Sequence, residues 1–443
     1  MLESVKNAFK LKEIRQKLLY TLAMMVVIRI GSQLPAPGID RTYFSNWFAA
    51  QTGDAFSFVD AFSFVDAFTG GSFLNMSILA LNITPYITSS IIIQLLTIAI
   101  PKLEEMQKEG EEGRKLLISI TRYVTVALAL MEAAAMAIGF GRQGLLEEYN
   151  AINIIMVICT LTAGSAFLMW IGEQITEKGV GNGISIVLAI NIISRMPQDI
   201  ASLFSQFVIG KTIAIGAVAA VIIIAIIVAM VVLVILLNDA ERRIPVQYAQ
   251  KIQGRRLVGG ANSVIPLKVN TAGVMPIIFA SSLMEFPVII STLAGYKGTG
   301  IWSEVIRYLS SSYWCNPRQI KYTLGLLVYI ALLIFFAYFY TSITFNPIEI
   351  ADNLKKRGGF IPGIRPGKPT SEYLNRILNY IIFIGAIGLT IVGILPFIFR
   401  GVFNASVSFG GTSLIIVVSV VLETIKQVES LMMVRNYKGF LND

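Results

Sequence analysis

A glycine-rich segment is the first part of the sequence whose residue types could do chemistry. It reads GEQITEKGVGNGIS over residues 172–185 and holds three glycines within five residues. Glycine-rich loops can cradle phosphates, but that motif needs a preceding strand and a following Lys-Ser/Thr, and this segment has neither. The spacing instead predicts a tight turn, after which Asn182 or Ser185 caps the next helix.

Two residue types that support catalysis are scarce. The sequence has no histidine, which excludes Ser-His and Cys-His catalysis, histidine metal sites and the HExxH type of intramembrane protease. Cys159 lies in an apolar run and Cys315 in a polar loop, so we expect neither a disulfide framework nor a CxxC metal site. The residue types therefore favour a protein that binds or conducts rather than one that catalyses.

The composition is that of a membrane protein. Of 443 residues, 55% are hydrophobic and 14% are charged, whereas about a quarter of the residues of a soluble domain are charged. The mean hydropathy is +0.70 and the pI is near 9.4. A net charge of +9 is compatible with binding to nucleic acid, to an anionic membrane face or to an acidic partner. The positions of the basic residues decide among these.

Ten apolar runs are long enough to cross the hydrocarbon core of a bilayer. They cover residues 18–34, 76–100, 116–140, 151–171, 183–203, 213–237, 272–293, 322–344, 374–398 and 410–432. The run 213–237 is the strongest, since no charge interrupts it. The run 183–203 is the weakest, because Asn191, Arg195 and Pro197 interrupt it, and we expect it to border a cavity rather than lipid.

The basic residues are distributed unequally over the loops between these runs. About 25 of the 36 lie on one side, about nine lie on the other, and Arg29 and Arg122 lie inside spans. The positive-inside rule then predicts that both termini are cytoplasmic. The first seventeen residues are basic and amphipathic and lack a cleavage site, which indicates a retained first span.

Ten spans with both ends on one side divide into two halves of five, 1–203 and 204–443, that enter the membrane from opposite faces. The first half contains the amphipathic N-terminus and spans one to five. The second contains spans six to ten and two long polar connections, 238–271 and 345–373. Connections this long, basic and rich in Gly and Pro are expected to have a function of their own.

Several long motifs together resemble one known family. They read ALNITPYITSSIIIQ (80–94), GEQITEKGVGNGIS, AERRIPVQYA (240–249), PLKVNTAGVMPIIFASS (266–282), ADNLKKRGGFIPGIRPG (351–367) and GGTS (410–413). In this order, over essentially the whole chain, they resemble the SecY/Sec61-alpha family, whose members are channel-forming subunits of protein translocases. The bacterial members belong to the Sec translocase of the plasma membrane.

The resemblance implies an all-α multi-pass membrane protein with ten helices in two inverted halves, arranged as a clamshell hinged between spans five and six. It implies a central channel subunit that passes unfolded secretory proteins across the membrane. Signal sequences and transmembrane segments would leave through a lateral gate between span two and spans seven and eight. The resemblance implies no cofactor and no enzymatic activity.

Polar side chains on spans two and seven fit such a gate, because polar seams can hydrogen-bond across helices and still separate. The gate residues implied by the resemblance are Asn82, Thr84, Ser89, Ser90, Gln94, Thr271, Ser281 and Ser282. An apolar ring at mid-membrane would seal the pore by excluding water. Its members would be Ile83, Ile87, Leu188, Ile192, Ile278 and Ile416. Ordinary packing in the core or against lipid is the alternative for both sets.

A short plug before span two is also implied by the resemblance, within residues 54–75. The sequence DAFSFV occurs at 54–59 and again at 60–65, ahead of DAFTGG. This tandem copy departs from the family pattern. We expect the copy nearest Gly70 to pack as the plug and the upstream copy to lie in the outer vestibule. The implied plug residues are Asp66, Ala67, Phe68, Thr69, Gly70 and Gly71.

The family's cytoplasmic loops dock the SecA ATPase or the ribosome. The implied docking residues are Arg242, Arg243, Arg255, Arg256, Lys355, Lys356 and Arg365. Gly363, Pro366 and Gly367 surround Arg365 and would hold its charge outward, although plain topogenic charge is the alternative. The other implied partners are SecE and SecG, polypeptides that carry signal sequences, and membrane lipids.

Two other classes of protein compete with this interpretation. An inverted-repeat secondary transporter of a small solute would need ionisable groups near mid-membrane. Its candidates are Arg29, Arg122, Glu132, Glu285 and Glu423, and most of them lie nearer the ends of spans. An intramembrane protease would need histidine or paired intramembrane aspartates, and the sequence has neither.

Overall fold

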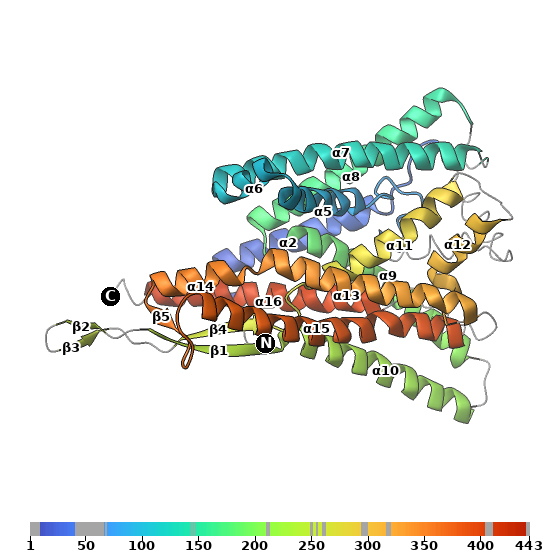
Figure 1. Cartoon of the computed structure of the whole chain (residues 1–443). Helices are drawn as coiled ribbons and strands as arrows, with labels where there is room; N and C mark the ends of the chain where they lie inside the picture. Colours follow the sequence, from blue (N-terminus) through green and yellow to red (C-terminus); the bar gives the residue numbers. More distant parts are fainter. Residues whose placement is uncertain are drawn as a thin grey trace. The chain divides into compact units, whose positions relative to one another are not determined.

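The computed structural model describes residues 9–39, 66, 69–142, 144, 146, 148–209, 213–248, 251–253, 256–258, 263–293, 300–315, 320–403 and 411–439. Helices dominate these residues, and each predicted span overlaps one of them (Figure 1). The ten helices are α2 (Lys12–Gly31), α5 (Thr84–Ala99), α7 (Glu111–Arg142), α8 (Ala151–Lys178), α9 (Gly183–Phe207), α10 (Ile213–Asp239), α11 (Met275–Leu293), α13 (Leu324–Thr344), α15 (Lys368–Phe403) and α16 (Gly411–Gly439).

Length and hydropathy identify membrane spans among the described residues. Six helical segments are long and apolar enough to cross a membrane, in α7, α8, α9, α10, α13 with its neighbours, and α15. A seventh arises if α5 and α6 (Pro101–Lys108), which are bent by 107° at Ile100, count as one span. The prediction of a multi-pass helical membrane protein is confirmed.

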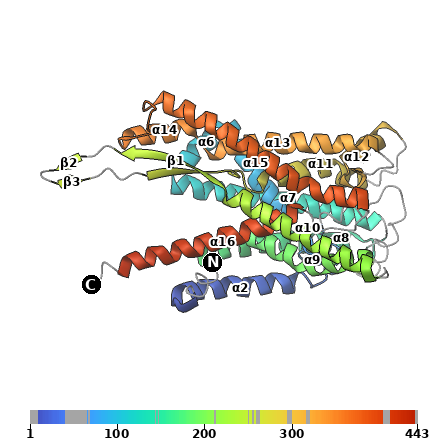
Figure 2. The same cartoon turned by 90° about the horizontal axis from the view of Figure 1, so that it is seen from below.

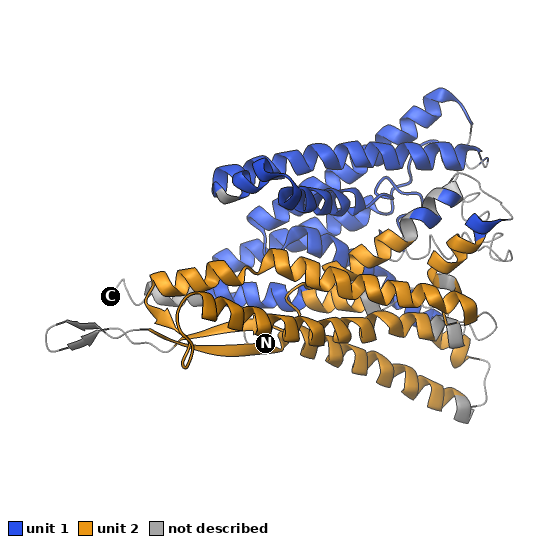
Figure 3. Ribbon diagram, in the orientation of Figure 1, with its two compact units in different colours: residues 1–202, 287–303, 420–443 blue, residues 203–286, 304–419 orange. Residues whose placement is uncertain are grey.

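The chain forms two compact units, which Figure 3 colours separately. Unit 1 contains Met1–Ser202, Pro287–Ser303 and Val420–Asp443, and unit 2 contains Leu203–Phe286 and Glu304–Ser419. Helices α11, α12 (Ile301–Leu309) and α16 therefore each contribute residues to both units. The inverted relation between sequence halves 1–203 and 204–443 stays a prediction.

In unit 1, α7 packs against both α5 and α8. Small residues on one face of α7, among them Ala129, Ala133 and Ala137, join a buried apolar cluster with Phe73 and Met76 from the segment before α5. Small side chains let the backbones of membrane helices approach closely. The apolar face of α7 therefore supports the segment that leads into span two.

The predicted second span, 76–100, begins too early. Residues 76–83 form turns, and Met76 and Asn82 have φ angles of 42° and 52°. The regular helix α5 begins at Thr84, with a proline in its first turn. Proline is favoured there because its fixed φ suits a helix and its missing N–H would have no intrahelical partner.

The connection 238–271 of unit 2 contains strands that were not predicted from the sequence. Strand β1 (Glu241–Tyr248) pairs antiparallel with β4 (Ser263–Lys268) and with β5 (Gly359–Phe360), in the order β4-β1-β5. A separate hairpin joins β2 (Lys251–Gln253) and β3 (Arg256–Val258). Ile244 and Val246 of β1 are buried and alternate with exposed residues, which is the period of a half-buried strand.

Helix α15 is the centre of unit 2. It contacts α13 and α10, which run beside it, and α14 (Pro347–Lys356) (Figures 1 and 2). Near its start, Leu374 and Ile377 pack with Ile244 of β1 and Leu354 of α14 in one apolar cluster. The short 3-10 helices Ser311–Tyr313 and Ile320–Thr323 complete the described elements. Both long polar connections thus fold onto the same end of α15.

Candidate functional site

The segment before α5 is held to α9 by an ion pair. The carboxylate of Asp66, which is fully buried, pairs with the guanidinium of Arg195. Its Oδ1 also accepts a hydrogen bond from the backbone N of Leu74 at 2.9 Å. On the other side of Arg195, Nε lies 3.8 Å from Oδ1 of Asp199, one helical turn later. One arginine of α9 therefore faces two carboxylates.

Gly70 brings this segment into direct backbone contact with α9. Its φ is +67°, and a Cβ there would lie 2.5 Å from the carbonyl oxygen of Asn191 and 2.9 Å from Oγ of Ser194. Thr69 Oγ1 closes the turn, since it donates to the Asp66 carbonyl and accepts from Phe73 N, both at 3.2 Å. The left-handed conformation and the missing side chain are both needed at position 70.

A second contact to α9 uses two buried amides. Nδ2 of Asn191 donates to Oδ1 of Asn82 at 3.0 Å. Asn82 was predicted to line the gate, but its side chain is buried and hydrogen-bonded inside unit 1. This arrangement fits the packing alternative for Asn82, and the gate role stays a prediction.

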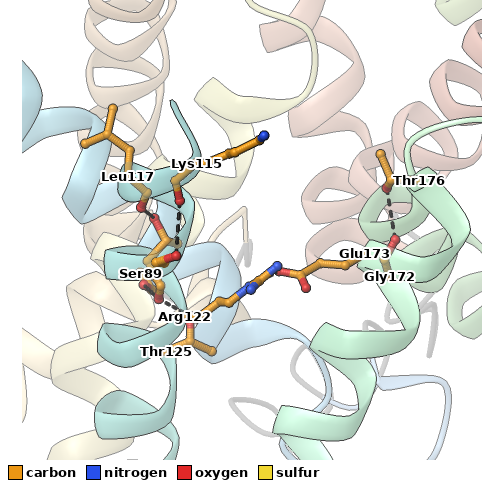
Figure 4. A network of polar contacts seen from close by, with 10 residues as sticks. Ser89, Lys115, Leu117, Arg122, Thr125, Gly172, Glu173 and Thr176 are labelled. Atoms are coloured by element: carbon orange, nitrogen blue, oxygen red, sulfur yellow. Dashed lines mark hydrogen bonds and ion pairs between the residues drawn. The ribbon is translucent and has the colours of Figure 1, made fainter. Parts of the chain in front are cut away.

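Figure 4 shows the polar contacts among α5, α7 and α8. Ser89 is buried, and its Oγ donates to the Thr121 carbonyl at 2.7 Å. Thr125 Oγ1 donates to the same carbonyl at 2.7 Å. Nε of Arg122 lies 2.8 Å from Oε1 of Glu173, so an ion pair joins α7 to α8. Ser89 thus joins helices within unit 1.

The other predicted gate residues differ in exposure and belong to different units. Thr84 and Ser282 are exposed, whereas Ser90, Gln94 and Thr271 are half-buried. Ser281 is buried, and its hydroxyl donates to the Ile277 carbonyl of its own helix at 2.9 Å. Residues 82–94 belong to unit 1, and Thr271, Ser281 and Ser282 belong to unit 2. A gate formed by the two sets stays a prediction.

The residues of the predicted pore ring are also divided between the two units. Leu188 and Ile192 are buried one turn apart on α9, with Ile83 and Ile87 elsewhere in unit 1. Ile83 is also buried and Ile87 is half-buried. Ile278, half-buried, and Ile416, buried, belong to unit 2. Their assembly into one ring stays a prediction.

The predicted plug is described in part. Asp66, Thr69, Gly70 and Gly71 form the turn on α9. Ala67, Phe68 and the duplicated sequence at 54–65 lie outside the described residues. The prediction for the upstream copy is therefore untested.

The glycine-rich turn between α8 and α9 uses its N–H groups within the protein. Val180 N donates to Oγ1 of Thr21 at 3.1 Å, and Gly181 N donates to Oε1 of Gln427 at 2.6 Å. Asn182 is the cap, since its Oδ1 accepts from the N–H groups of residues 184 and 185 at 3.1 and 3.4 Å. These donors are occupied, so the turn is a joint between helices rather than a phosphate cradle.

The predicted docking residues are exposed where the structure describes them. Arg242 and Arg243 lie on β1, and Lys355 and Lys356 end α14. Arg255 and the side chain of Arg256 lie outside the described residues.

Arg365 is exposed on an anchored turn between β5 and α15. Its carbonyl accepts from Oγ1 of Thr370 at 2.8 Å. Gly363 and Gly367 adopt φ angles of 83° and 102°. Ile361 and Ile364 on the same turn join the apolar cluster at the start of α15. The turn is fixed while the guanidinium points into solvent.

The roles of Arg195 and Asp199 were not predicted from the sequence. Arg195 was noted only as an interruption of the run 183–203. The charge of Arg195 inside a predicted span could have identified the site, because ionisable residues within a span mark functional positions. The partner could not be identified, since Asp66 lies 129 positions earlier in the sequence.

Comparisons with known proteins give the family of the chain. The sequence model of the SecY family matches residues 77–425. The protein translocase subunit SecY of Corynebacterium glutamicum is 41% identical over 458 residues, which cover 99% of this chain and all of that protein.

Two solved structures share the fold, each with a TM-score of 0.59 and coverage of 94% of this chain and 92% of the other. One, 19% identical, belongs to work on the SecY plug domain that stabilises the closed state of the translocation channel. The other, 18% identical, is Sec61 in a canine ribosome-channel complex. Sequence and structure agree, and the chain belongs to the SecY family of protein translocase subunits.

Proposed function

We propose that this chain is the central subunit of a protein-conducting channel that passes unfolded secretory proteins across a membrane. Signal sequences and transmembrane segments leave it sideways through a lateral gate. The observation that carries this proposal is the segment before α5, in which Asp66, Gly70 and Asn82 each contact α9. Within the predicted plug, the contacts of Asp66 and Gly70 with α9 suit a segment that closes a pore and can also leave it.

The gate and the ring complete the proposed path. The buried apolar side chains of Ile83, Leu188 and Ile192 support a seal made by excluding water. The half-buried Ser90 and Gln94 on α5 support a polar seam that can part. We assign Ile278 and Ile416 to the ring from the resemblance to the family.

A motor or a ribosome would dock on the basic connections. The exposed Arg365 and the lysine pair at the end of α14 support this assignment, because a fixed backbone presents these charges to solvent. SecA would supply the energy as an ATPase, and this chain would itself catalyse no reaction. Contacts to ribosomal RNA would go through phosphates and would weaken with salt.

A single-span partner has a place on unit 1. An apolar groove of about 620 Å³ lies between α2 and α9, with Met25, Val26, Ile30 and Ile190 in its lining. We assign this groove to the helix of SecE, and SecG is a further subunit implied by the family. Nη1 of Arg29, which is buried in this groove without a hydrogen-bond partner, would donate to a polar oxygen of the partner helix.

The proposed location is the plasma membrane of a bacterium, with both termini cytoplasmic. The excess of basic residues on one side supports this orientation. Lipid would cover α10, whose Val218 and Val221 are among its exposed apolar side chains.

Purified protein in sealed vesicles tests the proposal against a solute transporter. We expect vesicles that also contain the single-span partners to import a protease-protected precursor when SecA and ATP are added. Import should require a signal sequence on the precursor. Uptake of a small solute driven by an ion gradient, without import of the precursor, would establish the transporter instead.

A further inference from the structure

We propose that Arg195 is a two-partner clamp, which holds the plug segment closed through Asp66 and keeps Asp199 as its partner when that segment leaves. This inference rests on the proposed channel function, because Asp66 belongs to the proposed plug, which lies within residues 54–75. It assigns to Arg195 the role of a positioning residue and gives the two aspartates opposite roles.

The geometry of the clamp is asymmetric. Asp66 comes from the plug segment, is fully buried and pairs with Nη1 of Arg195. Asp199 comes from α9 itself, four residues after Arg195, with 3.8 Å between Oδ1 and Nε. The side chain of Arg195 is only 18% exposed. Movement of the plug segment separates Arg195 from Asp66 but leaves it beside Asp199.

A half-buried arginine needs a partner in both states. Removal of one member of a buried ion pair is strongly destabilising, because it leaves the other charge uncompensated. With Asp66 as its sole partner, Arg195 would be unpaired in the open channel and opening would be disfavoured. Asp199 lowers that cost, since residues four apart on a helix face each other.

Hydrogen bonds within the segment hold Asp66 to Thr69 and to Leu74 independently of α9. Oδ1 of Asp66 accepts from Leu74 N, and the Asp66 carbonyl accepts from Thr69 Oγ1, so these bonds stay within the segment. Two contacts, the ion pair of Asp66 and the close approach of Gly70, join this part of the segment to α9. Breaking these two contacts leaves the hydrogen bonds of Asp66 to Thr69 and Leu74 in place.

The clamp predicts opposite effects from the same chemical change at two positions. Asp66→Asn removes the charge but keeps an oxygen that can accept from Leu74 N, so it weakens only the closed state. Asp199→Asn leaves the Asp66 pair in place and removes the partner of the open state. The first should open the channel and the second should hold it shut.

Ion flux through sealed vesicles in the absence of the motor measures both effects. We expect Asp66→Asn to raise the basal leak on the order of tenfold. Asp199→Asn should leave the basal leak low and reduce, severalfold, the flux that a synthetic signal peptide induces. Arg122→Gln is the matched control, since Arg122 pairs with Glu173 elsewhere in unit 1, and its fluxes should equal those of the unsubstituted protein.

Three results would overturn the clamp: an unchanged leak in Asp66→Asn, an unchanged peptide-induced flux in Asp199→Asn, or an equal rise of leak in both variants. If Asp66→Asn does not yield folded protein, Arg195→Gln provides the same measurement, and a leak that stays low contradicts the clamp. Precursor import by the unsubstituted protein separates the two proposals. If the unsubstituted protein imports the precursor, any of these three results excludes the clamp and leaves the channel function standing. If the unsubstituted protein does not import the precursor, the channel function itself is excluded.

Discussion

At the scale of single residues, the contact of the proposed plug segment with α9 depends on the absence of a side chain as much as on charge. Gly70 has a positive φ and lies against the backbone of α9. The neighbouring Gly71 also has a positive φ, of +85°, but a Cβ there would be 3.8 Å from its nearest neighbour, Nδ2 of Asn75. The two glycines share one conformation and differ in available space.

This pair gives a matched test of the contact with α9. Gly70→Ala should raise the basal ion leak of vesicles, because its Cβ would overlap Asn191 and push the segment away from α9. Gly71→Ala bears the same cost of about 1–2 kcal/mol for a left-handed conformation but should leak little. Equal leaks would mean that backbone strain alone, and not the contact with α9, decides the position of the segment.

At the scale of elements, the glycine-rich turn joins α8 and α9 to α2 and to the C-terminal part of α16. Thr21 of α2 accepts the N–H of Val180, and both residues are buried. Gln427 of α16 accepts the N–H of Gly181. Val180 also packs with Ile14 and Val428 in a small apolar cluster. One turn thus fixes helices from both ends of the sequence.

The prediction at this turn concerns stability. Thr21→Val keeps the shape of the side chain but leaves the buried N–H of Val180 without an acceptor. We expect it to lower the free energy of unfolding by about 1–3 kcal/mol, measured by denaturation in detergent. Thr344→Val is the control, because the Thr344 hydroxyl is exposed, and it should change stability by less than about 0.5 kcal/mol. Equal losses would refute the importance of the Thr21 hydrogen bond.

The turn between β5 and α15 carries the prediction for docking. Arg365→Glu should leave insertion and folding intact, because the side chain is exposed and the turn is fixed by Thr370 and by Ile361 and Ile364. It should abolish export driven by the motor, measured as import of a precursor into vesicles. Arg376→Glu, an equally large charge change at an exposed position of α15, should retain import. Normal import by Arg365→Glu would exclude the docking role.

The elements differ in how far the sequence predicts them. Long apolar runs such as 213–237 locate helices because a span needs only length and hydropathy. The start of α5 was misplaced because residues 76–83 are equally apolar yet form turns around Asn82. The sheet was missed because β1 contains few buried residues and one of its partners, β5, comes from a distant position in the sequence. The Asp66 pair was missed for the same reason.

At the scale of the whole molecule, the cations and the shortage of other charges have separate explanations. The shortage of charge belongs to the spans, as the exposed apolar face of α10 illustrates. Eleven of the 36 basic residues lie in the two long polar connections, 238–271 and 345–373. In the proposed channel, these surfaces bind the partners that supply energy, and the spans form the path.

The most direct test of this account asks whether a polypeptide passes the proposed ring. A photoactivatable residue at Ile192, buried on α9, is compared with one at Ile222, exposed on α10. A precursor arrested during import should crosslink to position 192, and position 222 should react with lipid instead. Crosslinks to the precursor at neither position, or at position 222 alone, would contradict a path for protein through this chain.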